Sequence, residues 1–101
     1  MVEPQFDELI HPSTRLSLVA LLASTDWADF SFLRERLNLS DSALSKQLTT
    51  LEQAAYVTID RRVTNRRRRV RARLTDAGRQ AFDGHVAALQ AVIAAAEPVV
   101  R

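Results

Sequence analysis

The spacing of apolar positions predicts a largely helical protein, most clearly in residues 40–51, SDSALSKQLTTL. The apolar residues of this stretch recur at helical spacing and define one face, which consists of Ala43, Leu44, Leu48 and Leu51. The opposite face is small, hydroxyl-bearing and singly positive, and it carries Ser42, Ser45, Lys46, Thr49 and Thr50. Ser40 is expected to cap the first turn, because its hydroxyl can accept a hydrogen bond from an unpaired amide. Taken alone, the pattern is that of any amphipathic helix with a solvated polar face.

A first helix is expected to begin near Pro12, which suits the first position of a helix, and to run to about Ala23. This segment is apolar nearly all round, so we expect it to be buried on several sides as the central helix of the core. The residues expected on one of its faces are Leu16, Val19, Ala20 and Ala23, and Leu18, Leu21 and Leu22 are expected to widen this face.

A second helix is expected over residues 32–38, with Ser31 as its cap and Asn38 as a terminator that tolerates the left-handed conformation. Its inward-facing residues are expected to be Phe32, Leu33 and Leu37. The short aromatic segment 27–30 before it would form an edge strand or a bridge. Because only a short connection separates this helix from residues 40–51, the pair is typical of a helix-turn-helix.

A two-stranded ribbon is expected after these helices. Residues 56–59 are β-prone, and residues 70–74 alternate apolar side chains with arginines, a period of two that indicates a half-buried strand. The arginine-rich segment 61–69 would connect the two strands, with Thr64 and Asn65 at the tip.

A long last helix is expected to follow Thr75 as its cap and to run towards Glu97, where Pro98 stops it. Its apolar residues recur four and three positions apart, in a stripe of Phe82, Val86, Leu89, Ile93 and Ala96. This stripe could pack against the chain's own core or against a second copy. A helix of about 20 residues spans roughly 30 Å, which is long enough to extend beyond so small a body. This length favours a dimer interface, while packing against the chain's own core stays open.

Length and composition are those of one globular domain. The chain has 101 residues, of which 47% are hydrophobic and 26% are charged, a balance that supports a single small core. We therefore assign residues 1–101 to one domain with an N-terminal arm (1–11), a core that holds the ribbon (12–75) and a last helix (76–97). The expected fold class is mainly α with a small β-ribbon.

Several classes of function are disfavoured. The chain has no cysteine, which removes disulfides, thiolate metal sites and cysteine nucleophiles and fits a reducing cytoplasm. Its two histidines are far apart in sequence, and we expect His11 at a helix boundary and His85 on the outer side of the last helix. Without a nucleophile beside a base or clustered metal ligands, we expect neither an enzyme nor a metal or other cofactor. No apolar run is long enough for a membrane span, and no basic-then-apolar signal opens the chain.

Charge is distributed unevenly along the chain. The formal net charge is only +2, yet eight arginines and no acid lie between residues 61 and 73. That leaves six basic residues against 12 acidic ones in the rest of the chain. A compact protein with one dense positive segment on an acidic body is expected to turn that segment towards a polyanion. The alternative is a charged hairpin that is merely solvated.

The order of these elements, together with two local motifs, resembles a known family. The motifs are LNLSDSALSKQLTTLE at residues 37–52 and RLTDAGR at residues 73–79. Over roughly residues 12–82 the chain is similar to the compact winged helix-turn-helix transcriptional regulators related to the MarR and ArsR groups. The resemblance implies a three-helix core with a wing of two or three strands. It also implies a homodimer, with one recognition helix per subunit in the major groove of double-stranded DNA and each wing on the backbone or minor groove.

Carried onto this sequence, the resemblance matches groove-facing positions of the recognition helix and the arginines of the wing. With their neighbours, the expected DNA-binding residues of the recognition helix are Ser40, Ser42, Ser45, Lys46, Thr49 and Thr50. Those of the wing are Arg61, Arg62, Arg66, Arg67, Arg68, Arg69 and Arg71. Lys46 is the best candidate for a guanine edge, and the arginines are suited to phosphates.

The sequence departs from the family in two places. Family members usually carry glycine just before the aromatic residue that follows the recognition helix, whereas this chain has Ala55 before Tyr56. If that position needs a positive φ, alanine costs on the order of 1 kcal/mol there. Longer MarR-type members also enclose an effector pocket with further helices, for which little chain is left. Aromatic residues could line such a pocket at the dimer junction or simply pack in the core: Trp27, Phe30, Phe32, Tyr56 and Phe82.

These observations favour a sequence-specific regulator of transcription that binds double-stranded DNA. The alternative from another class is a winged-helix adaptor whose basic ribbon docks on an acidic protein partner.

Overall fold

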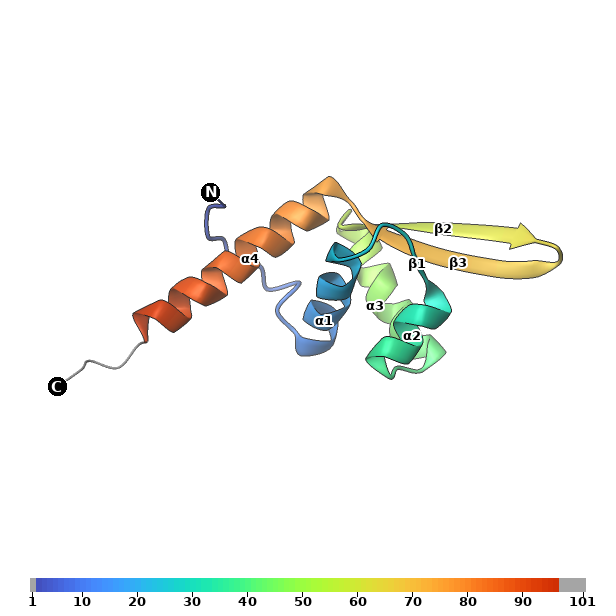
Figure 1. The fold of residues 1–101 in the computed structure, drawn as a ribbon, viewed down its shortest axis with the longest axis horizontal. Helices are drawn as coiled ribbons and strands as arrows, with labels where there is room; N and C mark the ends of the chain where they lie inside the picture. The colour runs from blue at the N-terminus through green and yellow to red at the C-terminus, as the bar shows by residue number, and fades with distance from the viewer. Residues whose placement is uncertain (1, 97–101) are drawn as a thin grey trace.

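The computed structural model describes residues 2–96, which form four helices and a three-stranded antiparallel sheet. The order is α1 (Ser13–Ala23), β1 (Ala28–Asp29), α2 (Phe30–Leu37), α3 (Asp41–Gln53), β2 (Val57–Thr64), β3 (Arg67–Leu74) and α4 (Asp76–Ala95). Helices α1 to α3 form one body, from which the β2–β3 ribbon extends on one side and α4 on the other (Figure 1). The expected fold class is confirmed, while the predicted stop at Glu97 and Pro98 lies outside the described residues.

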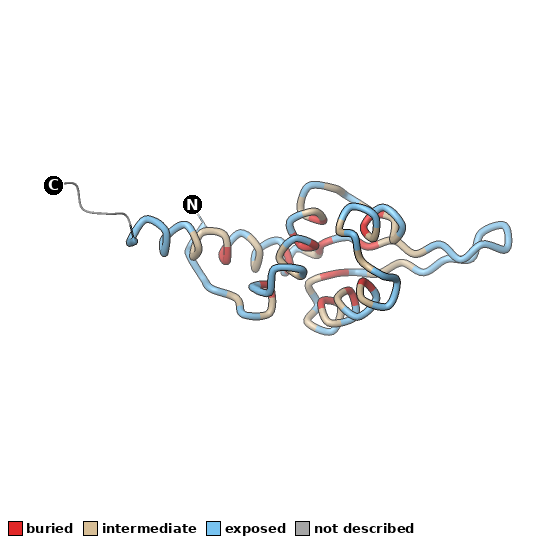
Figure 2. Tube along the Cα trace, turned by 90° about the horizontal axis from the view of Figure 1, so that it is seen from below, coloured by how far each residue is buried: buried red, intermediate tan, exposed pale blue. Residues whose placement is uncertain are grey.

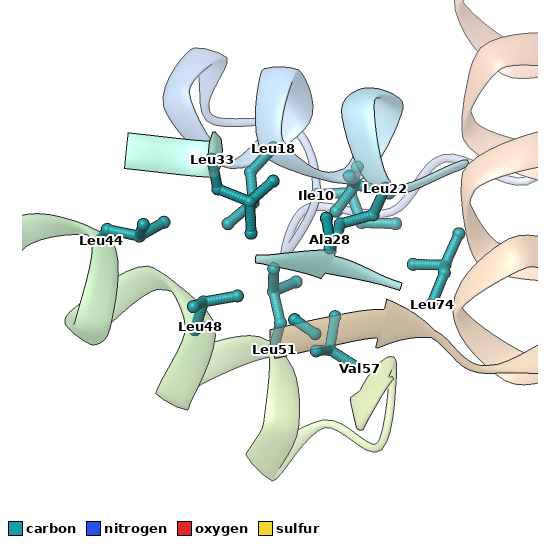
Figure 3. Packing of buried hydrophobic residues seen from close by; sticks show 12 residues of the cluster. Ile10, Leu18, Leu22, Ala28, Leu33, Leu44, Leu48, Leu51, Val57 and Leu74 are labelled. Atoms are coloured by element: carbon teal, nitrogen blue, oxygen red, sulfur yellow. The ribbon is translucent and has the colours of Figure 1, made fainter. Parts of the chain in front are cut away.

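The core lies between the three short helices and the base of the sheet. In α1, Leu18, Val19 and Leu22 are fully buried, and leucines of α2 and α3 point towards them (Figure 3). The prediction that α1 is the central helix is therefore confirmed. Ala20 was expected to face inward but is exposed, because the larger side chains of this apolar helix decide which side is buried.

Helix α2 begins earlier than expected, at Phe30, because β1 pairs with β3 and the chain passes directly from β1 into the helix. The expected edge strand is thus present, and Ser31 lies inside the helix instead of capping it. Phe32 was expected to point inward but is 37% exposed, and the guanidinium of Arg36 lies 5.5 Å from its ring centroid. Asn38 ends the helix in the left-handed conformation, as predicted, with φ 53° and ψ 49°.

The sheet has the order β1-β3-β2 and is antiparallel throughout. Its register runs from Val57 opposite Leu74 to Thr64 opposite Arg67. The ribbon is therefore longer than expected, and its turn consists of Asn65 and Arg66, one residue beyond the predicted tip. Both turn residues have positive φ values, 51° and 64°, as the two-residue turns that match strand twist require. We call the β2–β3 ribbon the wing.

The end of α3 is held against the start of α4. Ala55 adopts φ 63°, and the next amide, that of Tyr56, donates to the carbonyl of Leu51 at 3.0 Å. The Thr75 hydroxyl caps α4 by accepting from the Gly78 amide at 3.0 Å, and it donates to the carbonyl of Ala55 at 2.7 Å. A Cβ at Gly78 would collide with the carbonyl oxygen of Tyr56, which explains the glycine in the RLTDAGR motif.

Because Ala55 adopts the positive φ that glycine tolerates without strain, we expect Ala55→Gly to raise the free energy of unfolding by about 1 kcal/mol. Urea denaturation followed by circular dichroism would measure the change. The matched control is Ala54→Gly, since Ala54 precedes it with φ −84° and should lose stability on substitution. Equal destabilisation by both variants would show that position 55 carries no strain.

Candidate nucleic-acid interface

Helix α3 presents a polar face to solvent because its apolar face is used by the core. Leu44, Leu48 and Leu51 are at most 2% exposed. Ser40 caps the helix as predicted, with its hydroxyl accepting from the Ala43 amide at 3.1 Å. The predicted polar residues Ser42, Ser45, Lys46 and Thr49 are all exposed. The hydroxyl of Thr50, in contrast, donates to the carbonyl of Lys46 at 3.0 Å and is already engaged by the helix backbone.

A broad open groove separates α3 from the wing. Its walls are the polar face of α3, with Ser45 and Thr49, and the wing, with Arg61 and Arg68. Asp29 at the end of β1 and Phe30 and Ser31 at the start of α2 also line the groove. The wing projects beyond the core as a two-stranded ribbon with exposed residues along its outer half (Figure 2). The two elements that sequence reasoning assigned to DNA therefore flank one concave surface.

Acidic residues outside the arginine-rich segment 61–73 neutralise the base of the wing. Five of the eight arginines between residues 61 and 73 form ion pairs. The pairs are Arg61–Glu52 (3.4 Å), Arg62–Asp60 (2.9 Å), Arg69–Asp29 (3.4 Å), Arg71–Asp60 (2.9 Å) and Arg73–Asp26 (3.1 Å). The sequence shows eight like charges without an acid among them, but the fold supplies the counter-charges from β1, α3, β2 and the loop before β1.

Asp60 and Trp27 brace one face of the wing. Asp60 lies opposite Arg71 in the strand register, and the hydrogen bond from Arg71, with the charge of Arg62, lowers the pKa of the Asp60 carboxyl below its ordinary value. The indole of Trp27 lies under two guanidinium groups, 4.3 Å from Arg71 and 5.1 Å from Arg73. These cation–π contacts give Arg71 and Arg73 a structural role at the wing base.

The tip of the wing carries the arginines that the fold does not neutralise. Among residues 2–96, no carboxylate lies within salt-bridge distance of Arg66, Arg67 or Arg68. All three are exposed, as is Val63 beside them. The positive charge that is available to a partner is therefore concentrated at the end of the wing.

The apolar stripe of α4 divides into two parts. Phe82 packs against the core, and Val86 and Leu89 are half-buried. Further along the helix Ile93 is 68% exposed and Ala96 is exposed. Figures 1 and 2 show this last part of α4 extending beyond the three-helix body. The first part serves the chain's own core, and the second part has no partner among residues 2–96.

The two histidines lie together, contrary to expectation. His85 is fully buried and not on the outer side of α4, and its Nε2 lies 3.3 Å from Nδ1 of His11. Sequence reasoning missed this cluster because the N-terminal arm (residues 2–11) folds back onto α4, a contact that no local pattern signals. One local signal for the burial of His85 is its position in α4. It lies between Val86 of the apolar stripe and the small residue Gly84.

The aromatic residues named as pocket candidates do not gather at one place. Trp27 lies at the wing base, Phe32 lies on the surface of α2, and the other three pack against the core: Phe30, Tyr56 and Phe82. Within residues 2–96, no helix is long and apolar enough to cross a membrane. In the same part of the chain, no three side chains of the metal-binding types converge on one point.

Comparison with known proteins agrees with this geometry. The model of the winged helix DNA-binding domain family matches residues 14–93, so the chain belongs to that family. A curated relative, uncharacterized protein MJ0432 of Methanocaldococcus jannaschii, is 29% identical over 79 residues, which cover 78% of this chain and 86% of the relative.

Solved structures share the fold. The transcriptional regulator homologue protein from Pyrococcus horikoshii OT3 matches with a TM-score of 0.84 at 23% identity, covering 91% of each chain. YusO protein from Bacillus subtilis matches with a TM-score of 0.69 at 26% identity, covering 81% of this chain and 57% of YusO. NadR, solved in complex with 4-hydroxyphenylacetate, matches with a TM-score of 0.70 at 24% identity, covering 87% of this chain and 62% of NadR. The resemblance to the MarR-type winged helix is confirmed, and the family is that of winged helix DNA-binding domains.

Proposed function

We propose that this protein is a sequence-specific transcriptional regulator that binds double-stranded DNA as a homodimer. In this proposal α3 enters the major groove and the tip of the wing contacts the backbone or minor groove. The observation that carries the proposal is the concave surface between the exposed polar face of α3 and a wing whose uncompensated charge lies at its tip.

The face of α3 suits base readout. Its exposed side chains are short hydroxyls around one lysine, so the helix backbone can approach the floor of a groove about 12 Å wide. Lys46 is long enough to reach a guanine edge beyond the serines, and Ser42, Ser45 and Thr49 can bond phosphates, bases or bridging waters. Ser40 remains part of the proposed contact, although its hydroxyl already accepts from Ala43, because a hydroxyl retains donor capacity.

The tip of the wing suits phosphates. Arg66, Arg67 and Arg68 are exposed and have no carboxylate partner among residues 2–96. Contact with DNA would therefore release counterions without first breaking an ion pair in that part of the chain. Arg66 adopts φ 64° in the turn, where glycine is strongly preferred. A long cation at a position that costs about 1 kcal/mol for any side chain supports a functional role. Arg61, Arg62, Arg69 and Arg71 would have to exchange or share their carboxylate partners in order to reach DNA.

The unpartnered part of α4 suits a second copy of this chain. Val92 and Ile93 are 61% and 68% exposed, and the alanines around them permit close approach of another helix. Burial against the same surface of a twofold-related copy would cover both patches at once. Such a dimer would present two α3 helices to half-sites about one turn of DNA apart.

Lys46→Ala should weaken binding to the cognate site by about 1–3 kcal/mol, which corresponds to roughly 5- to 150-fold, and should leave the fold intact. The measurement is a fluorescence-anisotropy titration of duplex from the gene's own upstream region, with unrelated duplex as competitor. Gln53→Ala, an exposed change at the end of the same helix, is the matched control. Binding that resists competitor and depends on Lys46 supports the proposal. Binding that any duplex displaces contradicts sequence specificity, and no binding at low salt favours an adaptor for an acidic protein.

Lys46 is also the only lysine in the sequence, which gives a second readout of the same contact. Acetylation followed by mass spectrometry should modify Lys46 in the free protein and much less in the complex. The α-amino group of the chain serves as the internal reference. Equal acetylation of Lys46 with and without DNA would place α3 outside the groove.

Sedimentation velocity should show a dimer for the native protein and a monomer for Ile93→Glu, because the substitution introduces a charge into the proposed apolar interface. Val63→Glu is the matched control, since Val63 is 76% exposed on the wing and lies far along the chain from α4. A native protein that sediments as a monomer, or an Ile93→Glu variant that remains dimeric, would contradict the α4 interface.

A further inference from the structure

The N-terminal arm is docked along α4 by backbone hydrogen bonds. The amide of Gln5 donates to the carbonyl of Gly84 at 2.9 Å, and the amide of Asp7 donates to Nδ1 of His85 at 3.0 Å. Figure 1 shows this part of the chain passing beside the middle of α4 before it turns into α1. The ring of Phe6 packs on both imidazoles, with centroid distances of 4.8 Å to His11 and 4.7 Å to His85.

These contacts fix the protonation state of His85. Because its Nδ1 accepts a hydrogen bond from an amide, that nitrogen carries no proton, and the ring proton of the neutral imidazole is on Nε2. Nε2 lies 3.3 Å from Nδ1 of His11, so His85 donates and His11 accepts. The docked arrangement therefore requires an unprotonated Nδ1 on both His85 and His11. A further proton on either histidine removes one of the two bonds.

Protonation of His85 is the more disruptive change. An imidazolium carries a proton on Nδ1, which would face the Asp7 amide donor across the same 3.0 Å contact. The charge would also be buried, since His85 has no exposed surface. His11 is exposed to solvent and its Nδ1 lies 3.3 Å from Nε2 of His85. It therefore connects the buried imidazole of His85 to protons from solvent.

The charged groups around His85 do not offset the cost of protonating it in the docked state. Burial and the nearby His11 lower the pKa of His85, and the carboxylate of Asp7 raises it by a smaller amount. Both oxygens of that carboxylate already have donors, the Tyr56 hydroxyl at 2.6 Å and the Leu9 amide at 2.9 Å. This contact in turn raises the pKa of Tyr56 to about 12, so Tyr56 remains a donor throughout the neutral range. From α1, Arg15 brings a positive charge to the arm through the carbonyl of Leu9 at 2.7 Å.

The arm also touches the helix proposed to read DNA. Tyr56, which holds Asp7, lies in the turn that follows α3, after Ala54 and Ala55. Arg15, which holds Leu9, donates through Nε to the side-chain oxygen of Gln47 in α3 at 2.9 Å. The arm is therefore bonded to α4 on one side and, through two polar bridges, to α3 on the other.

We propose that the N-terminal arm is a proton-released latch: protonation of the His11–His85 pair frees the arm from α4 and weakens DNA binding by loosening α3 relative to α4. The DNA part of this inference rests on the proposed function, whereas release of the arm does not. The docked state binds fewer protons than the released state. It is favoured above the ordinary histidine pKa of about 6.5 and is lost as pH falls from there through the lowered pKa of docked His85.

The first test follows the latch without DNA. With only two histidines in the sequence, imidazole ¹H–¹⁵N correlation spectra report the tautomer and titration of each ring. At about pH 7.5 we expect His85 to carry its proton on Nε2, and towards about pH 5.5 we expect it to titrate together with the Gln5 and Asp7 amides. Docking should weaken up to about tenfold for each unit by which the pKa of docked His85 lies below that of the released ring. A proton on Nδ1 of His85 at the higher pH, or arm amides that do not respond to pH, would overturn the latch.

Variants separate the latch from other effects of pH. His85→Gln keeps a neutral acceptor at this position and should abolish the transition while the arm remains docked. Because His85 is buried, His11→Gln at the exposed partner provides a second variant, which should alter the transition without endangering the core. An unchanged transition in a folded His85→Gln protein, or in His11→Gln if the first variant does not fold, would contradict the role of the pair.

DNA affinity supplies the final readout. The native protein should lose affinity between about pH 7.5 and about pH 5.5 more steeply than His11→Gln does. Tyr56→Phe, which cuts the bridge between Asp7 and the end of α3, should keep the arm transition and reduce its effect on DNA. Equal pH dependence of DNA binding in all three proteins would refute the coupling. If no duplex binds at any pH, the proposed function fails while the spectra still decide the release of the arm.

Discussion

Pairing of arginines with acids at the base of the wing is the interaction on which the candidate interface depends. An isolated two-stranded ribbon is at best marginally stable in water, and like charges directly opposite each other destabilise it further. Arg62 lies directly opposite Arg69 in this ribbon. Each of them is matched to a carboxylate, Asp60 for the first and Asp29 for the second. The sheet can therefore continue beyond the core and bring its uncompensated charge to the tip.

A second set of contacts holds the wing, α3 and α4 in one arrangement. The Thr75 hydroxyl caps α4 and also binds the carbonyl of Ala55 at the end of α3. The close approach of Gly78 to the Tyr56 carbonyl fixes the same junction from the other side. A twofold dimer through α4 would therefore set both the distance and the angle between its two α3 helices. The arm, which bonds to α4 and reaches α3 through Tyr56 and Arg15, acts on this same geometry.

Local patterns predicted the parts of the fold that local physics decides. The caps Ser40 and Thr75, the left-handed stop at Asn38 and the buried face of α3 all follow from residues within a few positions of one another. The arginine pairs could not be predicted, because their acids come from β1, α3, β2 and the loop before β1. Nor could the burial of His85, which depends on the arm returning to α4 from 78 residues away along the chain. The predicted tip of the wing, Thr64 and Asn65, lies one residue before the observed turn, Asn65 and Arg66, because strand register and not composition selects the two turn positions.

The salt dependence of DNA binding by two matched double variants tests most directly whether the charge available to DNA lies at the tip of the wing. Arg67→Gln/Arg68→Gln removes uncompensated charge from the tip, and Arg62→Gln/Arg69→Gln removes the same formal charge from the paired part of the wing. Binding of an unrelated duplex should show a steep fall of log K with log salt for the native protein. The tip variant should flatten this slope by up to about 0.9 for each phosphate that it no longer neutralises, and the base variant should flatten it clearly less. Equal flattening by both variants, or a tip variant with the native slope, would contradict the claim that the fold concentrates its DNA-binding charge at the tip of the wing.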